Sequence, residues 1–257
     1  MRLDDIVISK AIIETYTKKL LDCLELDVAI VGAGPSGLTA AYFIAKNNKK
    51  VGVFERHLSV GGGMWGGGMM FNQIVIQEEG KKLLEEFDVH THEFQPGYYT
   101  ADAIECVSSI TKSAIHAGAQ IFNLITVEDV MMQEERVNGL VLNWSAVKIA
   151  ELHIDPLTIR AKYVIEATGH PTEVLKVLEK KAGVKLRTPS GTVEGERPMW
   201  AELGEKLIIE NTKEVFPGVW VTGMAVNAAY GSPRMGPIFG GMLLSGKVCA
   251  QRILSTL

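Results

Sequence analysis

Residues 27–55, DVAIVGAGPSGLTAAYFIAKNNKKVGVFE, constrain the fold more than any other stretch of the chain. An apolar, β-branched run ends at a glycine turn, an alanine-rich helical segment follows, and a second apolar run ends at Glu55. This order of strand, turn, helix and strand is the context in which G-x-G-x-x-G binds a dinucleotide. The stretch therefore predicts an α/β, Rossmann-like dinucleotide-binding fold.

Each position of the glycine turn has a physical role in such a site. Gly32 permits the tight turn, Gly34 lets the backbone approach a pyrophosphate, and Gly37 lets the helix pack closely on the strand. The N–H groups at the helix start face the phosphates. Glu55, about twenty residues beyond the glycines, is spaced to accept hydrogen bonds from the adenosine ribose hydroxyls. We predict that these residues bind the adenylate half of a dinucleotide.

Length, charge and cysteine content narrow the class of protein. A chain of 257 residues suits one domain, in which we expect a dinucleotide-binding βαβ unit at 22–58, an inserted β-meander at 120–165 and a C-terminal strand, loop and helix at 219–257. The net charge of −4, with scattered basic residues, predicts no nucleic-acid partner. Three isolated cysteines favour a reducing compartment. The sequence has neither a signal-like start nor an apolar run of about 18 residues, so we expect a cytoplasmic protein that does not enter a membrane.

Two local patterns predict elements around the nucleotide unit. Residues 5–22 have the apolar spacing of an amphipathic helix, with Ser9 as a candidate N-cap. This helix would either cover one face of the sheet or contact another subunit. Within the meander, Asn138 and Gly139 favour a two-residue hairpin turn.

The stretch after Glu55 has an unusual composition. Residues 61–68 read GGGMWGGG, two glycine triplets around a methionine and a tryptophan. Such a run costs backbone entropy on folding unless a close backbone approach requires it. A flexible linker is the alternative, but linkers favour serine and charged residues. We predict a loop that wraps the ligand.

Three further positions carry candidate chemistry. His153 and Asp155, if they lie in a strand, project to the same face and form half of a metal site. His170 follows the apolar run 163–167, where ligands of doubly wound sheets bind. Histidine with a carboxylate suits non-haem iron or a similar divalent ion, whereas a structural role for each residue is the alternative. Arg234, among glycines and prolines before a helix, is a candidate ligand for a carboxylate or a phosphate.

Four motifs together resemble a known family. They are the fingerprint, the GGGMWGGG loop, the ATGH that ends at His170, and the RMGPxFGxMxxSG run that begins at Arg234. These motifs resemble the thiazole synthases of thiamine biosynthesis over essentially the whole chain. The resemblance implies a fold of the glutathione-reductase type and a homo-octamer with sites at subunit interfaces. It also implies synthesis of an adenylated thiazole carboxylate from NAD, which is consumed, and glycine.

The resemblance also implies roles for individual residues. Asp155 and His170 would bind Fe(II), in a site that a neighbouring subunit completes, and Arg234 would hold the glycine carboxylate. His153, the third catalytic position, stands where fungal and plant relatives carry a cysteine that gives up its sulfur, so the resemblance implies the branch that uses free sulfide. The contacts with NAD would come from Ser36, Glu55, Arg56, Gly63, Val127 and Met224.

Other functions remain open at the level of the sequence. A flavin- and NAD(P)H-dependent oxidoreductase would share the fingerprint, although such proteins usually carry an acid after the glycine of the last strand, where this chain has Met224 after Gly223. A sugar-phosphate isomerase could use His153 and Asp155 as acid and base. In a non-catalytic NAD sensor, His170 and Arg234 would be structural.

Overall fold

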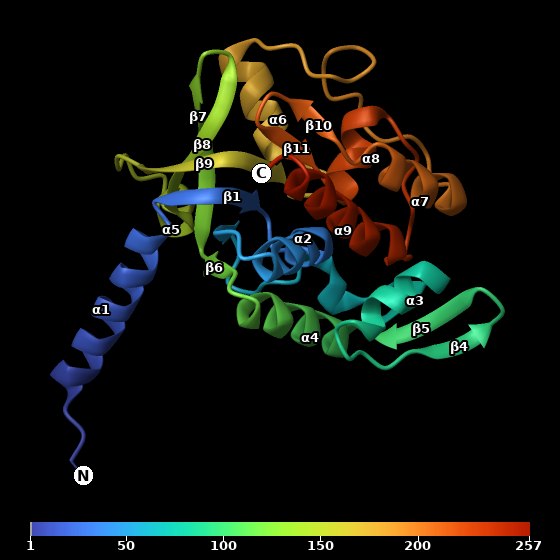
Figure 1. Ribbon diagram of the computed structural model, residues 1–257, viewed down its shortest axis with the longest axis horizontal. Helices are drawn as coiled ribbons and strands as arrows, with labels where there is room; N and C mark the ends of the chain where they lie inside the picture. The colour runs from blue at the N-terminus through green and yellow to red at the C-terminus, as the bar shows by residue number, and fades with distance from the viewer. Residues whose placement is uncertain (1) are drawn as a thin grey trace.

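The centre of the molecule is an eight-stranded sheet in the computed structural model, which describes residues 2–257. Its order is β10-β11-β9-β1-β2-β6, and β8 pairs with both β7 and β9 (Figure 1). The strands are β1 (Glu25–Val31), β2 (Val51–Glu55), β6 (Gln120–Asn123), β7 (Ile125–Gln133), β8 (Arg136–Trp144), β9 (Leu157–Glu166), β10 (Glu214–Phe216) and β11 (Val219–Val221). From β11 to β6 all neighbours are parallel, while β7, β8 and β9 pair antiparallel. The predicted α/β class with additional antiparallel strands is confirmed.

Helices cover both faces of this sheet. The helix after the glycine turn, α2, packs with three others on one face, and three further helices contribute to the core on the other face. The first group is α2 (Pro35–Lys46), α3 (Glu78–Glu85), α4 (Ala103–His116) and α9 (Gly240–Leu254), and the second is α6 (Glu173–Val177), α7 (Ala201–Glu210) and α8 (Met224–Tyr230). The other helices are α1 (Asp5–Asp22), η1 (Gly62–Gly66), α5 (Ser145–Ile149) and η2 (Leu178–Ala182). A second sheet, β3 (Gln73–Ile76), β5 (Tyr98–Asp102) and β4 (His92–Gln95), lies beyond α3 and α4 (Figure 1).

The core explains why β1 is apolar at nearly every position. Val28 and Ile30 belong to the cluster beneath α2 and α9, whereas Ala29 and Val31 belong to the cluster on the opposite face. Successive side chains of a strand point to opposite faces, so a strand covered on both faces needs an uninterrupted apolar run. Burial on both faces makes β1 the rigid base of the turn that follows it.

Helix α1 has the predicted bounds but a different N-cap, and its position excludes one of the two roles that the sequence left open. Asp4, and not Ser9, is its N-cap, because the Asp4 carboxylate accepts hydrogen bonds from the N–H groups of Ile6 and Val7. The helix projects from the body and buries none of its residues, so it does not cover a face of the sheet (Figure 1). Ile6, Ile12 and other apolar side chains of α1 are left exposed. No helix within residues 2–257 combines the length and the hydropathy that crossing a bilayer requires.

The predicted turn at Asn138 and Gly139 is wrong, since both residues lie inside β8. The hairpin between β7 and β8 turns at Glu134 and Glu135, which have φ of 50° and 59°. Gly139 is needed for a different reason: a Cβ there would stand 2.1 Å from the carbonyl oxygen of Ile159 in β9. The glycine thus allows close approach of neighbouring strands and not reversal of the chain.

A buried carboxylate joins three elements beside the sheet. Glu205 of α7 accepts hydrogen bonds from Gln77 Nε2 and from the N–H of Gly241 in α9, both at 2.8 Å. Burial is the largest influence on this carboxyl group and raises its pKa from 4.5 to about 7, although both hydrogen bonds act in the opposite direction. Between these two pKa values, the Glu205 carboxyl is protonated in the folded protein but ionised in the unfolded chain.

This raised pKa predicts a pH dependence of stability. The protonated Glu205 carboxyl stabilises the folded state fully below pH 4.5, and this stabilisation is lost as the pH rises through about 7. The reason is that the folded state binds more protons than the unfolded state across that range. The loss is on the order of 3 kcal/mol. We expect Glu205→Gln to raise the thermal unfolding midpoint at about pH 8 and to flatten the pH profile of stability below neutrality. Unfolding curves of both proteins across this range check the prediction, and an unchanged slope in the variant would contradict it.

Candidate functional site

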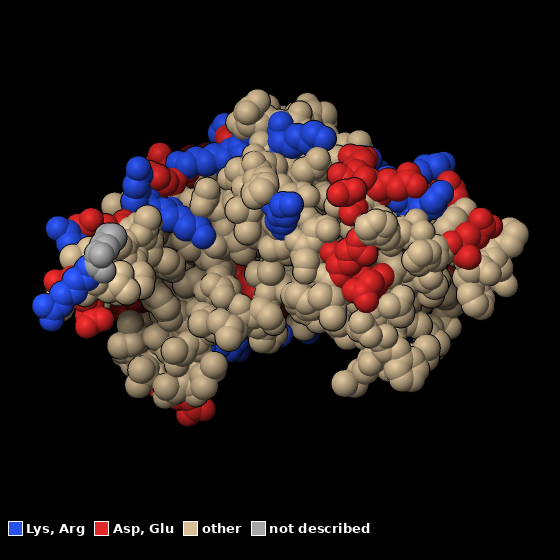
Figure 2. All heavy atoms as spheres, turned by 90° about the horizontal axis from the view of Figure 1, so that it is seen from below, with Lys and Arg blue, Asp and Glu red and all other residues tan. Residues whose placement is uncertain are grey.

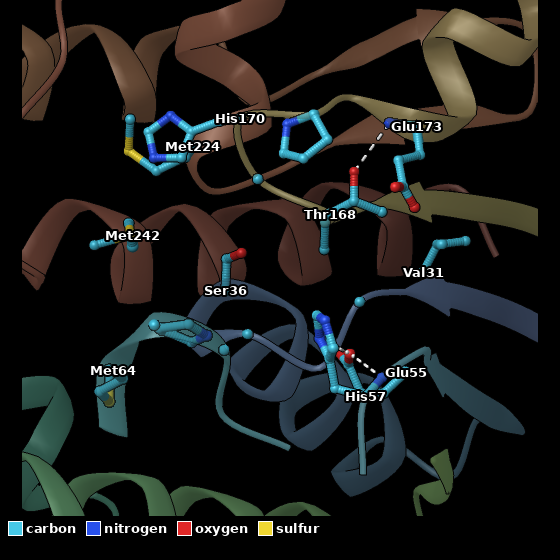
Figure 3. A pocket seen from close by; sticks show the side chains of 18 of the residues that line it. Val31, Ser36, Glu55, His57, Met64, Thr168, His170, Glu173, Met224 and Met242 are labelled. Carbon is cyan, nitrogen blue, oxygen red and sulfur yellow. Dashed lines mark hydrogen bonds and ion pairs between the residues drawn. The ribbon is translucent and has the colours of Figure 1, made fainter. Parts of the chain in front are cut away.

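A cavity of about 660 Å³ lies at the carboxyl ends of the parallel strands. It is lined by the residues that directly follow β1, β2 and β9 and by Met224, shortly after β11, as expected for a ligand site of a doubly wound sheet. His170 and Met224 lie on one side of the cavity, and Glu55 and His57 on the other (Figure 3). Ten of the predicted site residues line it: Gly32, Gly34, Ser36, Glu55, Arg56, Gly63, Val127, His170, Met224 and Arg234.

The glycine turn has the geometry that the fingerprint predicts. Gly32 has φ of 99°, a conformation that side chains with a Cβ rarely adopt. A Cβ on Gly37 would lie 2.1 Å from the Gly32 carbonyl oxygen, so this glycine is a packing residue and does not line the cavity. A Cβ on Gly34 would meet no atom of the protein within 4 Å and would stand in the cavity wall. Gly32 and Gly34 both line the cavity, and of these two Gly34 is the one at which a Cβ would meet no protein atom.

Glu55 ends β2 with a buried side chain at the cavity wall. Its Oε2 accepts from the N–H of Ala33 at 2.9 Å, and its Oε1 accepts from the N–H of His57 at 2.8 Å. His57 Nδ1 lies 3.0 Å from the same Oε1, and the imidazole itself lines the cavity. Glu55 is thus held in place by the backbone, and Oε2, which has a single N–H donor, can still accept from a ligand hydroxyl.

Arg56 and Glu173 form an ion pair beside the cavity, with the guanidinium donating to Glu173 Oε1. Both residues line the cavity, so the positive charge at the end of β2 has a partner within the chain. The backbone of Arg56 is also held, because its carbonyl oxygen accepts from Ser145 Oγ at 2.7 Å.

The opposite wall is built around the end of β9. Glu166, the last residue of β9, is fully buried, and its two oxygens accept from the N–H groups of Thr168 at 2.7 Å and Val174 at 2.6 Å. Burial raises the pKa of the Glu166 carboxyl despite these hydrogen bonds. The side chain joins the end of β9 to the start of α6, and so fixes the loop that carries His170. His170 Nδ1 in turn lies 2.6 Å from Glu196 Oε2.

Arg234 lies in the loop between α8 and α9, where its exposed side chain reaches the cavity rim. Its backbone is held on both sides: its N–H donates to the Arg197 carbonyl at 3.2 Å, and its carbonyl accepts from the N–H of Trp200 at 3.0 Å. Within residues 2–257 the guanidinium makes no ion pair or hydrogen bond to another side chain. Arg234 is therefore free to bind an anionic ligand group.

The structure contradicts the expected strand at His153 and Asp155. Both lie in the exposed irregular segment 152–156, before β9, and neither lines the cavity. The segment is held at its middle by the buried Asn143, whose Nδ2 donates to the Ile154 carbonyl at 3.1 Å. An irregular chain replaces the strand because pairing between β8 and β9 begins only at Leu157.

Asp155 and His170 lie at opposite ends of β9 in the same chain. This strand has 10 residues, and at about 3.3 Å per residue its ends are roughly 30 Å apart. Accordingly, residues 2–257 contain no cluster of three or more His, Cys, Asp and Glu side chains suited to a metal ion. A single chain cannot place both predicted ligands on one metal.

Polar residues of the cavity region that escaped the sequence interpretation include His57, Glu173 and Glu196. His57 lies two residues after Glu55, the predicted ribose-binding acid, and this position could have suggested it. Glu196 lies 26 residues from His170, in a loop without periodicity, so no local pattern could have found it.

A protein that binds nucleic acid usually carries a band of basic side chains on its surface. On the face in Figure 2, basic side chains stand in separate groups, several of them beside acidic ones, and no continuous basic band crosses that face. This face offers no extended electrostatic footprint for a phosphate backbone.

Known proteins with similar sequence or structure match this chain over nearly its whole length. Residues 9–239 match the Thi4 family. The thiamine thiazole synthase of Methanothermobacter thermautotrophicus is 57% identical over 257 residues, which is 100% of both chains. That of Pyrococcus furiosus is 56% identical over 255 residues and covers 99% of both chains. The crystal structure of Thermovibrio ammonificans THI4 superposes with a TM-score of 0.98 at 53% identity, covering 99% of each chain.

Proposed function

This chain belongs to the Thi4 family of thiamine thiazole synthases, and we propose that it forms an adenylated thiazole carboxylate from NAD, glycine and sulfide with the help of Fe(II). In this reaction NAD loses nicotinamide, and the remaining ADP-ribose opens and rearranges to a ketone. The glycine amine condenses with that ketone, sulfur is added, and ring closure with loss of water gives the thiazole. NAD is thus a substrate that is consumed.

The observation that supports this proposal best is the distribution of groups along the cavity. The glycine turn and Glu55 form one wall, while His170 and Arg234 come from the loops that follow β9 and α8. A dinucleotide bound by its adenylate half at the first wall would extend its nicotinamide ribose toward the second. The arrangement separates the part of NAD that is kept from the part that reacts.

Each wall has a task that its residues can perform. The bare backbone at Gly34 admits the pyrophosphate, and the Glu55 carboxylate accepts from the adenosine ribose hydroxyls. Ser36, Arg56, Gly63, Val127 and Met224 complete the NAD contacts that we propose, since all five line the cavity. Arg234, whose guanidinium has no partner side chain among the described residues, would pair with the glycine carboxylate through two parallel hydrogen bonds.

The donors proposed for Fe(II) fit the metal only if two subunits share it. Imidazole nitrogen and carboxylate oxygen are suitable ligands for Fe(II). Because Asp155 and His170 lie at opposite ends of β9, we propose that His170 of one subunit and Asp155 of a second approach the same site. Fe(II) bound there would supply Lewis-acid chemistry and a position for the sulfur nucleophile. His153, next to Asp155, cannot donate sulfur, which supports the use of free sulfide.

The exposed apolar surface supports an oligomer. Helix α1 buries none of its 18 residues, and most of its apolar side chains are exposed, as are Ile149 and, within the Asp155 segment, Leu152 and Ile154. Apolar surface of this extent on a single chain marks an interaction site. We propose that both regions pack against other subunits of a homo-octamer, which would bring the Asp155 segment to a neighbour's cavity.

An anaerobic reconstitution tests the proposed function. We expect the purified protein, given NAD, glycine, sulfide and Fe(II), to release nicotinamide and to form the adenylated thiazole carboxylate, measured by mass spectrometry. Omission of any one component should prevent product formation, and repeated turnover should follow because sulfide, and not the protein, supplies the sulfur.

Other outcomes would identify the alternatives. A purified protein with a flavin absorption band would favour an oxidoreductase, and isomerisation of a phosphorylated pentose without NAD would favour an isomerase. Binding of NAD with no release of nicotinamide under these conditions would favour a sensor. Any of the three would contradict the proposal.

A further inference from the structure

Glu196 is the partner of His170 within the chain. His170 Nδ1 lies 2.6 Å from Glu196 Oε2, which is hydrogen-bonding distance. The glutamate side chain is 13% exposed, and its Oε1 is buried with no hydrogen-bond partner among residues 2–257. The imidazole is therefore the one side chain in the described part of the chain to which this carboxylate is bonded.

A carboxylate at Nδ1 determines which imidazole nitrogen is available. An ionised carboxylate only accepts hydrogen bonds, so the His170 proton is held on Nδ1 and the lone pair is left on Nε2. A metal-binding histidine needs this arrangement, because its second nitrogen usually donates to a carboxylate that orients the ring. We propose that Glu196 is a positioning residue that holds His170 with Nε2 free to bind the metal. This inference rests on the role of His170 in the proposed function.

The segment around Glu196 is itself firmly held. Gly195 donates its N–H to the Ala228 carbonyl at 2.9 Å, and Arg197 donates its N–H to the Ser232 carbonyl at 3.1 Å. On the other side of the same ladder, the N–H of Arg234 donates to the Arg197 carbonyl at 3.2 Å. Glu196 thus projects from a backbone segment that is hydrogen-bonded to the loop of Arg234.

This position gives Glu196 a role that a surface ion pair would not have. The Glu196 side chain contacts His170 in the loop after β9. The backbone of the adjacent Arg197 forms hydrogen bonds with the loop after α8. These loops carry His170 and Arg234, which face the same cavity. One short segment therefore sets the relative positions of the proposed metal ligand and the proposed carboxylate ligand.

Glu196→Gln and Glu196→Ala test the inference, with Glu194→Gln as the matched control. Glu194 belongs to the same segment but accepts from the N–H of Ser190 and does not contact His170. In the variant Glu196→Gln, the amide N–H₂ can donate to Nδ1, which would move the proton to Nε2. In Glu196→Ala, the ring loses its orienting acceptor. Thermal unfolding and NAD binding of all three variants establish that the fold and the nucleotide site are intact.

Two measurements decide the outcome. Nitrogen-15 NMR of the metal-free protein, with His170→Gln to assign the signal, should show the proton on Nδ1 in the wild type and in Glu194→Gln, but not in Glu196→Ala. Co(II), used as a stable substitute for Fe(II), should bind about 10- to 100-fold more weakly to both Glu196 variants. Wild-type tautomer and Co(II) affinity in Glu196→Ala would overturn the inference. Failure of the wild type to bind Co(II) would instead refute the metal role of His170, and the NMR result would still decide whether Glu196 orients the ring.

Discussion

Alanine at Asp155 or at His170 is expected to abolish formation of the thiazole while NAD binding is retained. Asp155 is exposed and lies outside the cavity, and the exposed His170 side chain hydrogen-bonds, among residues 2–257, to the side chain of Glu196 alone. Neither change removes a buried group, so both variants should fold. Mass spectrometry of the product and calorimetry of NAD binding measure the two effects. Turnover at the wild-type rate in either variant would refute the iron assignment.

A mixture of the two inactive variants gives a sharper test of a site shared between subunits. A chain with Asp155→Ala still has His170, and a chain with His170→Ala still has Asp155. If chains mix at random in the oligomer, about a quarter of the sites receive both intact residues, and activity should return to about that fraction. A double variant, Asp155→Ala with His170→Ala, mixed with wild type in the same ratio serves as the control for subunit exchange. No recovery in a mixture shown to exchange subunits would mean that the two residues do not share a site.

Gly37→Ala is expected to destabilise the protein severely. The added Cβ would lie 2.1 Å from the Gly32 carbonyl oxygen and 3.3 Å from the Ala167 side chain, at the contact between α2 and the ends of β1 and β9. Backbone on this buried side cannot move without disturbing two strands. We expect the free energy of unfolding to fall by about 3 kcal/mol. For a chain of this size, this corresponds to a fall of roughly 6 to 12 °C in the unfolding midpoint. Thermal unfolding at a constant chain concentration measures it.

Gly34→Ala, three residues earlier, is the matched control. Its Cβ would meet no protein atom within 4 Å, and its φ of −75° is accessible to alanine. The variant should unfold within a few degrees of the wild type but bind NAD at least about tenfold more weakly, because the methyl group occupies the approach of the pyrophosphate. Equal destabilisation by the two substitutions would show that the separation of packing and ligand roles is wrong.

The nucleotide-binding half of the fold could be predicted from the sequence because its signals are local. The strand, turn and helix that contain Gly32 and Gly37 follow one another within residues 27–46, and their spacing alone specifies the geometry. Residues that follow parallel strands gather at one edge of the sheet, so Glu55 and His170 could be assigned to a common cavity without knowledge of the strand order.

The rest of the site depends on contacts that no local pattern encodes. Whether His153 and Asp155 lie in a strand is decided by where β8 stops pairing with β9, which is a property of two strands together. Gly139 carries the composition of a turn, but the close approach of Ile159 determines its role. Glu196 meets His170 only because the loop after η2 returns along α8 to the cavity.

Strand β9 separates the two proposed iron ligands of each chain by its full length. Under the shared-site proposal, every chain places its Asp155 at the cavity of one neighbour. Its own cavity must in turn receive Asp155 from the same neighbour or from a different one. A linear array of such chains would always end in one cavity without its carboxylate, so full occupancy requires a closed assembly, either by reciprocal exchange in pairs or around a ring. Dilution that releases single chains should then switch off the chemistry before it unfolds the protein or releases the nucleotide.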